Sequence, residues 1–276
     1  MVSDGPHALF AGRDTIDPFV HRRLRGARTL ALFLDYDGTL TPIAPTRESA
    51  LPGTTVLKML RALVALAGVR VAIVTGRSLS HLPRSIRASG ADLAVDHGVR
   101  IVSGHATWIH PGLDELKPVI REVYVAAEAR LGEIPGIRIE QKRWSVDIHY
   151  RQVHARHVAR IRTTMADVMR PYAGSLKLTR GKKVLEARPA ITWSKGHAIL
   201  KLLARPEYEG ALPIFIGDDR TDEDGFRALR GRGITIHVGR SRRTAARYAV
   251  RSVPDVLAFL AGIIADRSRE KGGGVG

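Results

Sequence analysis

The stretch LFLDYDGTLT, residues 32–41, decides the fold of this chain. It is an apolar run that ends in two aspartates, Asp35 and Asp37, before Gly38 turns the chain sharply. The run fits a buried strand, because strands covered on both faces are continuously apolar. By itself the segment also fits an ordinary Asp-Gly turn. Three later segments favour a catalytic interpretation.

Strand and helix patterns alternate on both sides of this stretch. Short apolar runs predict strands at 29–34, 69–74, 93–95, 214–216 and 234–238. Helical spacing predicts helices at 55–66, 78–88, 194–203, 223–229 and 253–264. Because strands and helices that alternate along a chain form parallel sheets, we expect an α/β fold with a Rossmann-like parallel-sheet core.

The middle of the chain has a different rhythm. A hairpin-like pair is expected at 99–109, and a helix–strand–strand order then occurs twice, without a repeated sequence. We therefore expect an α+β block inserted into the α/β frame. The expected division is an N-terminal arm at 1–28, a core at 29–103 and 191–266, the inserted α+β block at 104–190 and a flexible tail at 267–276.

Composition limits the partners. The 276 residues include no cysteine, so a disulfide or a thiolate metal site is impossible. A net charge of +17 fits an anionic partner, and a small anionic substrate is sufficient. Nucleic acid is not the expected partner, because the basic residues are scattered and aromatic residues make up only 5%, although arginines cluster within 227–251. No segment fits a signal peptide or a membrane span, so we expect a cytoplasmic protein without membrane contact.

Chemistry-bearing side chains follow the ends of predicted strands or start a predicted helix. They are Asp35, Asp37, Thr75, Lys195, Asp218, Asp219 and Asp222. Because a parallel sheet binds ligands beyond the carboxyl ends of its strands, we expect these residues to converge. The set suits phosphoryl transfer, with Asp35 as nucleophile and Asp37 as general acid and base. The Thr75 hydroxyl and the Lys195 ammonium would hold the phosphoryl oxygens.

Several carboxylates around one phosphate need a hard cation, since they would otherwise repel it. Mg²⁺ is the expected cofactor, because it takes oxygen ligands and phosphate. Asp35, the Asp37 carbonyl and Asp218 are the expected ligands. Asp219 and Asp222 are expected to orient waters or Lys195.

The order DxDGT, TGR, K and GDDxTDE resembles the haloacid-dehalogenase-like phosphatases over residues 29–260. This resemblance implies that the α+β insertion at 104–190 is a cap domain of the second cap class. Within the insertion the resemblance narrows to the trehalose-6-phosphate phosphatases. It is carried by DHG at 96–98, IEQKRWSVDIHYR at 139–151 and GKKVLEARP at 181–189. The resemblance implies Mg²⁺-dependent hydrolysis of trehalose 6-phosphate to trehalose and phosphate through an aspartyl-phosphate. A separate trehalose-6-phosphate synthase is then a candidate partner.

The same resemblance implies a set of substrate-binding residues. Gly76 and Arg77 are also expected to bind the substrate, and the resemblance implies that Arg188 supports the loop. The sugar-facing residues would be Glu140, Lys142, His149, Lys182 and Glu186. Asp96 departs from the family pattern, in which asparagine precedes His-Gly.

Other functions stay open at this point. The nearest is a phosphatase of another sugar or glycosyl-glycerate phosphate, with the same core and a different cap. A catalytically silent regulatory domain is disfavoured by the intact Asp35, Asp37 and Asp218. A basic nucleic-acid-binding protein would bind duplex DNA with a steep salt dependence. The sequence does not indicate an oligomeric state.

Overall fold

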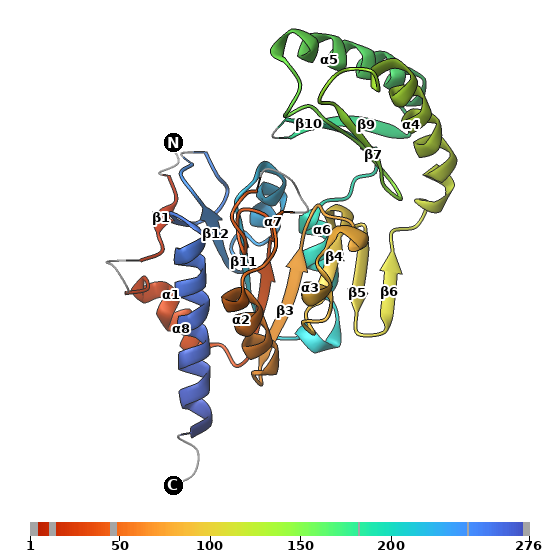
Figure 1. Ribbon diagram of the computed structural model, residues 1–276. Helices are drawn as coiled ribbons and strands as arrows, with labels where there is room; N and C mark the ends of the chain where they lie inside the picture. Colours follow the sequence, from red (N-terminus) through yellow and green to blue (C-terminus); the bar gives the residue numbers. More distant parts are fainter. Residues whose placement is uncertain (1–4, 11–14, 45–48, 182, 242, 273–276) are drawn as a thin grey trace. The chain divides into compact units, whose positions relative to one another are not determined.

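The computed structural model describes residues 5–10, 15–44, 49–181, 183–241 and 243–272. The chain divides into two compact units, which are coloured along the sequence in Figure 1. Met1–Trp108 and Trp193–Gly276 form the core unit, and Ile109–Thr192 form the inserted unit. The insertion thus begins at residue 109 rather than 104 and ends at 192 rather than 190.

A nine-stranded sheet forms the centre of the core unit, in the order β1-β13-β12-β11-β2-β3-β4-β5-β6. The strands from β1 to β4 in this order pair in parallel, and β5 is antiparallel to β4. Their bounds are β1 His7–Ala8, β2 Leu30–Leu34, β3 Val69–Val74, β4 Asp92–Val95, β5 Arg100–Ser103, β6 Ala106–Ile109, β11 Leu212–Gly217, β12 Ile234–Val238 and β13 Tyr248–Val250. The sheet confirms the expected α/β class.

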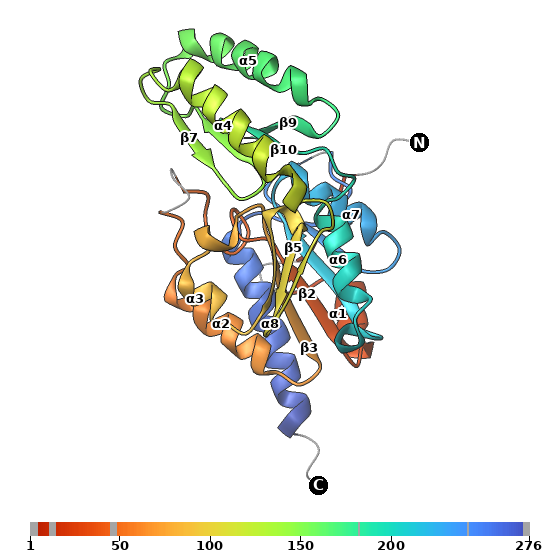
Figure 2. The same ribbon diagram turned by 90° about the vertical axis from the view of Figure 1, so that its right-hand side faces the viewer.

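Helices cover both faces of this sheet, which explains why its central strands are mostly apolar and buried along nearly their whole length. The helices of the core unit are α1 Pro18–Gly26, α2 Thr54–Ala65, α3 Arg84–Arg87, α6 Lys195–Leu203, α7 Glu223–Ala228 and α8 Val253–Gly272. Figure 2 shows α2, α3 and α8 on one side of the sheet and α6 and α7 on the other. None of the helices in the described residues is long and apolar enough to cross a membrane.

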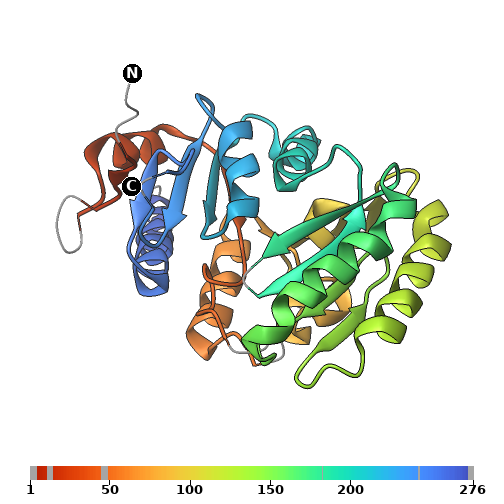
Figure 3. The same ribbon diagram turned by 90° about the horizontal axis from the view of Figure 1, so that it is seen from above.

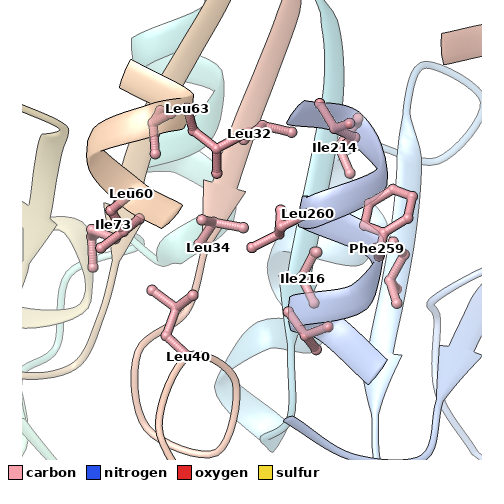
Figure 4. Packing of buried hydrophobic residues seen from close by; sticks show 14 of the residues in the cluster. Leu32, Leu34, Leu40, Leu60, Leu63, Ile73, Ile214, Ile216, Phe259 and Leu260 are labelled. Atoms are coloured by element: carbon pink, nitrogen blue, oxygen red, sulfur yellow. The ribbon is translucent and has the colours of Figure 1, made fainter. Parts of the chain in front are cut away.

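The two faces of β2 pack into separate hydrophobic clusters. Leu32 and Leu34 point towards α2 and α8, where they meet Leu60 and Leu260 (Figure 4). Phe33 points the other way, into a cluster with residues of α6 and α7. Leu32, Phe33 and Leu34 are completely buried in these clusters, so the strand that leads to the two aspartates is fixed from both sides.

The inserted unit is a four-stranded antiparallel sheet with two helices on one face. The strand order is β7-β8-β10-β9, with β7 Arg138–Gln141, β8 Val146–His149, β9 Leu176–Gly181 and β10 Val184–Pro189. Helices α4 Lys117–Leu131 and α5 Ala155–Met169 lie side by side, drawn in green in Figure 3. Their apolar sides pack on Val146, Ile148 and Leu185 from the sheet, which gives the unit its own core.

Three expectations differ from the structure. The helix expected at 78–88 is split into a turn at Leu79–His81 and α3, because Pro83 has no N–H and cannot continue a helix. Residues 1–28, expected as an arm, include α1 and the sheet strand β1, which pairs with β13. Within the expected tail, residues 267–272 continue α8.

Leu60→Ala should lower the free energy of unfolding by about 2–5 kcal/mol, because it leaves a cavity beneath α2. Chemical denaturation followed by circular dichroism measures this change. Leu51→Ala is the matched control, since Leu51 is 67% exposed and its loss should cost less than about 0.5 kcal/mol. Equal effects of the two substitutions would contradict the packing described for α2.

Candidate active site

Three neighbouring parallel strands end at the same edge of the large sheet. β2 lies between β3 and β11, with Leu34 opposite Ile73 on one side and Ile216 on the other. The Asp35 amide continues this ladder, since it donates to the Ile216 carbonyl at 3.0 Å. Asp35 therefore leaves β2 next to the point where β11 leads into Asp218. This is the edge at which parallel sheets bind ligands.

Lys195, the first residue of α6, joins two of these strand ends. Its Nζ lies 2.6 Å from Asp35 Oδ1 and 2.6 Å from Asp222 Oδ1. All three side chains are buried, so the ion pairs are shielded from solvent. A buried charge left without any partner is strongly destabilising, and Lys195 has two carboxylate partners.

Burial and like charges act together on this cluster. Burial raises the pKa of the Asp35 carboxyl well above its usual range, with Lys195 opposing and the Asp222 and Asp218 carboxylates adding to the rise. Burial alone would lower the pKa of the Lys195 ammonium, but Asp222 and Asp35 outweigh it and raise the pKa. Lys195 is therefore charged.

The loop after β11 is held by Asp222. Asp222 Oδ2 accepts hydrogen bonds from the amides of Asp218 and Asp219 at 3.1 and 2.9 Å. The Asp219 side chain accepts in return from the Asp222 amide, which makes a capping box for the turn Arg220–Asp222. A Cβ on Gly217 would lie 2.4 Å from Asp222 Cγ, so glycine is required for this close approach. Asp219 and Asp222 thus order the loop that carries Asp218.

Asp37 is held by Arg77 rather than by the lysine. Arg77 Nε and Nη2 donate to the two Asp37 carboxylate oxygens at 2.7 and 2.6 Å, a bidentate pair. The guanidinium also stacks over the Tyr36 ring and donates to the His81 carbonyl. Arg77 is 2% exposed. The structure thus places the guanidinium of Arg77, an expected substrate-binding residue, on the carboxylate of Asp37, which stays partly exposed.

Thr75 and Gly76 form the turn after β3. Thr75 is buried, and its Oγ1 accepts a hydrogen bond from the Arg77 amide at 3.1 Å. The His97 ring packs against Gly76, where a Cβ would lie 2.6 Å from the imidazole. Asp96 has a left-handed φ of 52°. Aspartate and asparagine both tolerate this conformation, which gives a physical reason for Asp96 where the related pattern has asparagine.

The donor set at the strand ends fits a hard divalent cation. Carboxylate oxygens of Asp35, Asp218 and Asp222 lie within 4.8 Å of one another. The Asp218 carboxylate lies against Gly38, at which a Cβ would be 2.2 Å away. Both Asp222 oxygens are engaged by Lys195 and by the loop amides. Asp35 and Asp218 are therefore the side chains best placed to hold Mg²⁺, whose preferred ligands are oxygens.

The sheet of the inserted unit has one polar face. Residues directly opposite in an antiparallel sheet, and every second residue along a strand, share a face. Opposite pairs are Glu140 with Asp147 and Asp147 with Glu186. The expected residues Glu140, Lys142, His149, Glu186 and Arg188 therefore all belong to the face that does not carry the core of α4 and α5. Lys182 lies outside the described residues.

Asp147 is the residue of this face that sequence reasoning missed. It is completely buried, and its Oδ2 lies 2.8 Å from Lys142 Nζ. His149 Nε2 lies 3.4 Å from Glu140 Oε2 and 3.8 Å from Asp147 Oδ2. The signal was present, since Asp147 lies two residues from His149 in an alternating strand.

Comparison with known proteins identifies the class and then the family. The fold is that of the haloacid-dehalogenase-like hydrolases. One such hydrolase from Bacteroides thetaiotaomicron superposes with a TM-score of 0.58 at 18% identity, over 88% of this chain and 99% of that one. A model of the trehalose-phosphatase family matches residues 33–254. The chain belongs to this family, which is one of phosphoric monoester hydrolases.

Individual relatives agree with this assignment. The trehalose 6-phosphate phosphatase RA3 of Zea mays is 34% identical over 252 residues, covering 84% of this chain and 69% of the relative. Trehalose-phosphate phosphatase B of Arabidopsis thaliana is 32% identical over 249 residues, covering 84% and 66%. The crystal structure of a trehalose-6-phosphate phosphatase related protein has a TM-score of 0.76 at 27% identity, covering 87% and 99%.

Gly217→Ala should lower the free energy of unfolding by about 1–3 kcal/mol, because the added methyl group displaces Asp222 from Lys195 and the loop amides. Thermal and chemical denaturation measure this loss. Gly26→Ala is the control, since nothing lies within 4 Å of its added Cβ. That substitution should leave stability unchanged or raise it by about 0.4–1 kcal/mol. An unchanged Gly217→Ala protein would show that the loop has room to move.

Proposed function

We propose that this protein hydrolyses trehalose 6-phosphate to trehalose and phosphate, through an aspartyl-phosphate on Asp35 and with Mg²⁺ as cofactor. The observation that carries the chemistry is the buried cluster of Asp35, Lys195 and Asp222 at the ends of β2 and β11. Membership of the trehalose-phosphatase family supports trehalose 6-phosphate as the substrate.

Asp35 is the proposed nucleophile. Its carboxylate attacks phosphorus, and the bond from phosphorus to the sugar oxygen breaks. Lys195 keeps its ammonium beside Asp35, so it orients the carboxylate and attracts the phosphoryl oxygens. The Thr75 hydroxyl, at the end of the neighbouring strand β3, is the proposed second contact to those oxygens.

Asp37 is the proposed general acid and base. It gives a proton to the departing sugar oxygen and then takes one from the water that attacks the aspartyl-phosphate. Its bidentate contact with the buried Arg77 fixes the orientation of the carboxylate for both proton transfers. Arg77 is therefore proposed to act through Asp37 instead of binding the phosphate itself.

Mg²⁺ is the proposed cofactor, because the carboxylates of Asp35, Asp218 and Asp222 would repel an incoming phosphate dianion. Asp35, Asp218 and the Asp37 carbonyl are the proposed ligands. When bound, the cation supplies positive charge that offsets this repulsion and stabilises the transferring phosphoryl group. Asp222 keeps Lys195 and the loop amides in position for this arrangement.

The polar face of the inserted unit is the proposed sugar-binding surface, and the inserted unit is accordingly proposed to be the cap. A disaccharide has many hydroxyls, which need both donors and acceptors for recognition. Glu140, Lys142 and Glu186 supply both kinds of group on one face of the sheet. His149 and Arg188 share that face, and the proposal extends to them.

Release of phosphate from a panel of sugar phosphates and an aryl phosphate tests the proposal. We expect trehalose 6-phosphate to give the highest kcat/KM, and Asp35→Asn to be inactive on every substrate. This variant should keep its fold, because asparagine has the same shape and Asp222 still pairs with Lys195. An Asp35→Asn rate above about one hundredth of wild type, a barrier change under roughly 3 kcal/mol, would exclude Asp35 as nucleophile. A higher kcat/KM for another sugar phosphate would contradict the proposal that trehalose 6-phosphate is the substrate.

Removal of divalent cations by EDTA should abolish activity, and added Mg²⁺ should restore it. Asp218→Asn should raise the Mg²⁺ concentration needed for half-maximal rate or abolish activity, because a ligand charge is lost. Asp224→Asn is the matched control, since Asp224 pairs with Arg227 at the protein surface. Full activity in cation-free buffer would contradict the proposed requirement for Mg²⁺.

A further inference from the structure

Asp147 is a carboxylate at the centre of the polar face of the inserted unit's sheet. It lies directly opposite Glu140 on β7 and Glu186 on β10, so three carboxylates form one row across three strands. Like charges directly opposite one another destabilise a sheet. Asp147 is also the middle of the row and completely buried. The row therefore needs positive charge close to Asp147.

Lys142 supplies that charge. Its Nζ lies 2.8 Å from Asp147 Oδ2, and its side chain is 1% exposed. Among the described residues, Asp147 is its one charge partner, and no acceptor meets hydrogen-bond geometry with Nζ. An ammonium group has three N–H donors. The pair thus holds a buried cation in place and leaves donors that a hydroxyl oxygen could satisfy.

A metal ion is a poorer occupant of this cluster than a sugar. Ligand atoms of Glu140, Asp147 and His149 lie within 4.8 Å of one another, a spacing that could hold a cation. However, the Lys142 ammonium already neutralises Asp147 and would repel a divalent ion at this position. A sugar hydroxyl carries no charge. It can accept a hydrogen bond from an ammonium group and donate one to a carboxylate.

We propose that Asp147 is a positioning residue for sugar recognition, which acts by fixing the Lys142 ammonium on the polar face of the inserted unit. The inference rests on the proposed sugar-phosphate hydrolysis and adds a residue to it. A lysine side chain has many rotamers, and ordering it only when substrate binds would cost affinity. Asp147 orders it beforehand, so less freedom is lost on binding.

A double-mutant cycle tests this role. Asp147→Asn, Lys142→Met and the double variant are compared with wild type, with kcat and KM measured on trehalose 6-phosphate and on p-nitrophenyl phosphate. Each single substitution should lower kcat/KM for the sugar phosphate about tenfold to a hundredfold, mostly through KM. Hydrolysis of the aryl phosphate, which has no sugar, should change less than about twofold.

The coupling between the Asp147→Asn and Lys142→Met substitutions decides whether Asp147 acts through Lys142. If Asp147 acts through Lys142, Asp147→Asn should have less than about a twofold further effect in the Lys142→Met protein. Losses that multiply in the double variant would overturn the proposal, as would equal losses on both substrates. Asp167→Asn, which removes the partner of Arg170 on the far side of this unit's core, is the control and should leave both activities unchanged.

Two further comparisons keep the test decisive. Should Asp147→Asn fail to fold, the paired Asp147→Leu/Lys142→Met variant removes both charges together. A purely structural ion pair predicts full sugar-phosphate activity in that variant, whereas our proposal predicts a selective loss. If the wild-type protein prefers another sugar phosphate, the double-mutant cycle is measured on that substrate. Failure of the proposed substrate can then be distinguished from failure of the proposed role of Asp147.

Discussion

The buried ammonium of Lys195 is the interaction on which the active site depends. It joins Asp35 at the end of β2 to Asp222 in the loop after β11, and it comes from the first turn of α6. Asp222 in turn receives the amides of Asp218 and Asp219. A single charge therefore fixes the relation between one strand, one helix and one loop that are far apart in the sequence. Its carboxylate partners offset the cost of desolvating this charge.

The second ion pair at this edge of the sheet, between Asp37 and Arg77, has a different proposed task from the first. Lys195 acts on the carboxylate proposed to bond phosphorus, whereas Arg77 acts on the carboxylate proposed to move protons. The two cations differ in a useful way. The guanidinium fork fixes both oxygens of Asp37 in a plane, while the ammonium is a point charge that can also serve a phosphate. The residue types thus match the two proposed tasks.

The sequence predicted what depends on local pattern and on motif order, and it missed what depends on close contact. Runs rich in apolar and β-branched residues located β2, β3 and β12, because burial on both faces leaves a clear signal. The short strands β1 and β13 carry too few residues for such a signal. The pairing of Arg77 with Asp37 was not predicted, since it arises from two loops brought together only in the fold. Asp147 was missed because a single buried carboxylate in an alternating strand looks like a surface residue.

The way the chain enters and leaves the inserted unit has an evolutionary consequence. Trp108 and Trp193, the core-unit residues on either side of the insertion, have ring centroids 5.0 Å apart. The two ends of the insertion are thus anchored to each other within the core unit, and the inserted residues form one contiguous segment with its own apolar interior. A short turn could join the two tryptophans and would remove only Ile109, the last residue of β6, from the large sheet. Replacement of the inserted unit between Trp108 and Trp193 can therefore change what such a protein recognises. The carboxylates at the strand ends of the core unit stay the same.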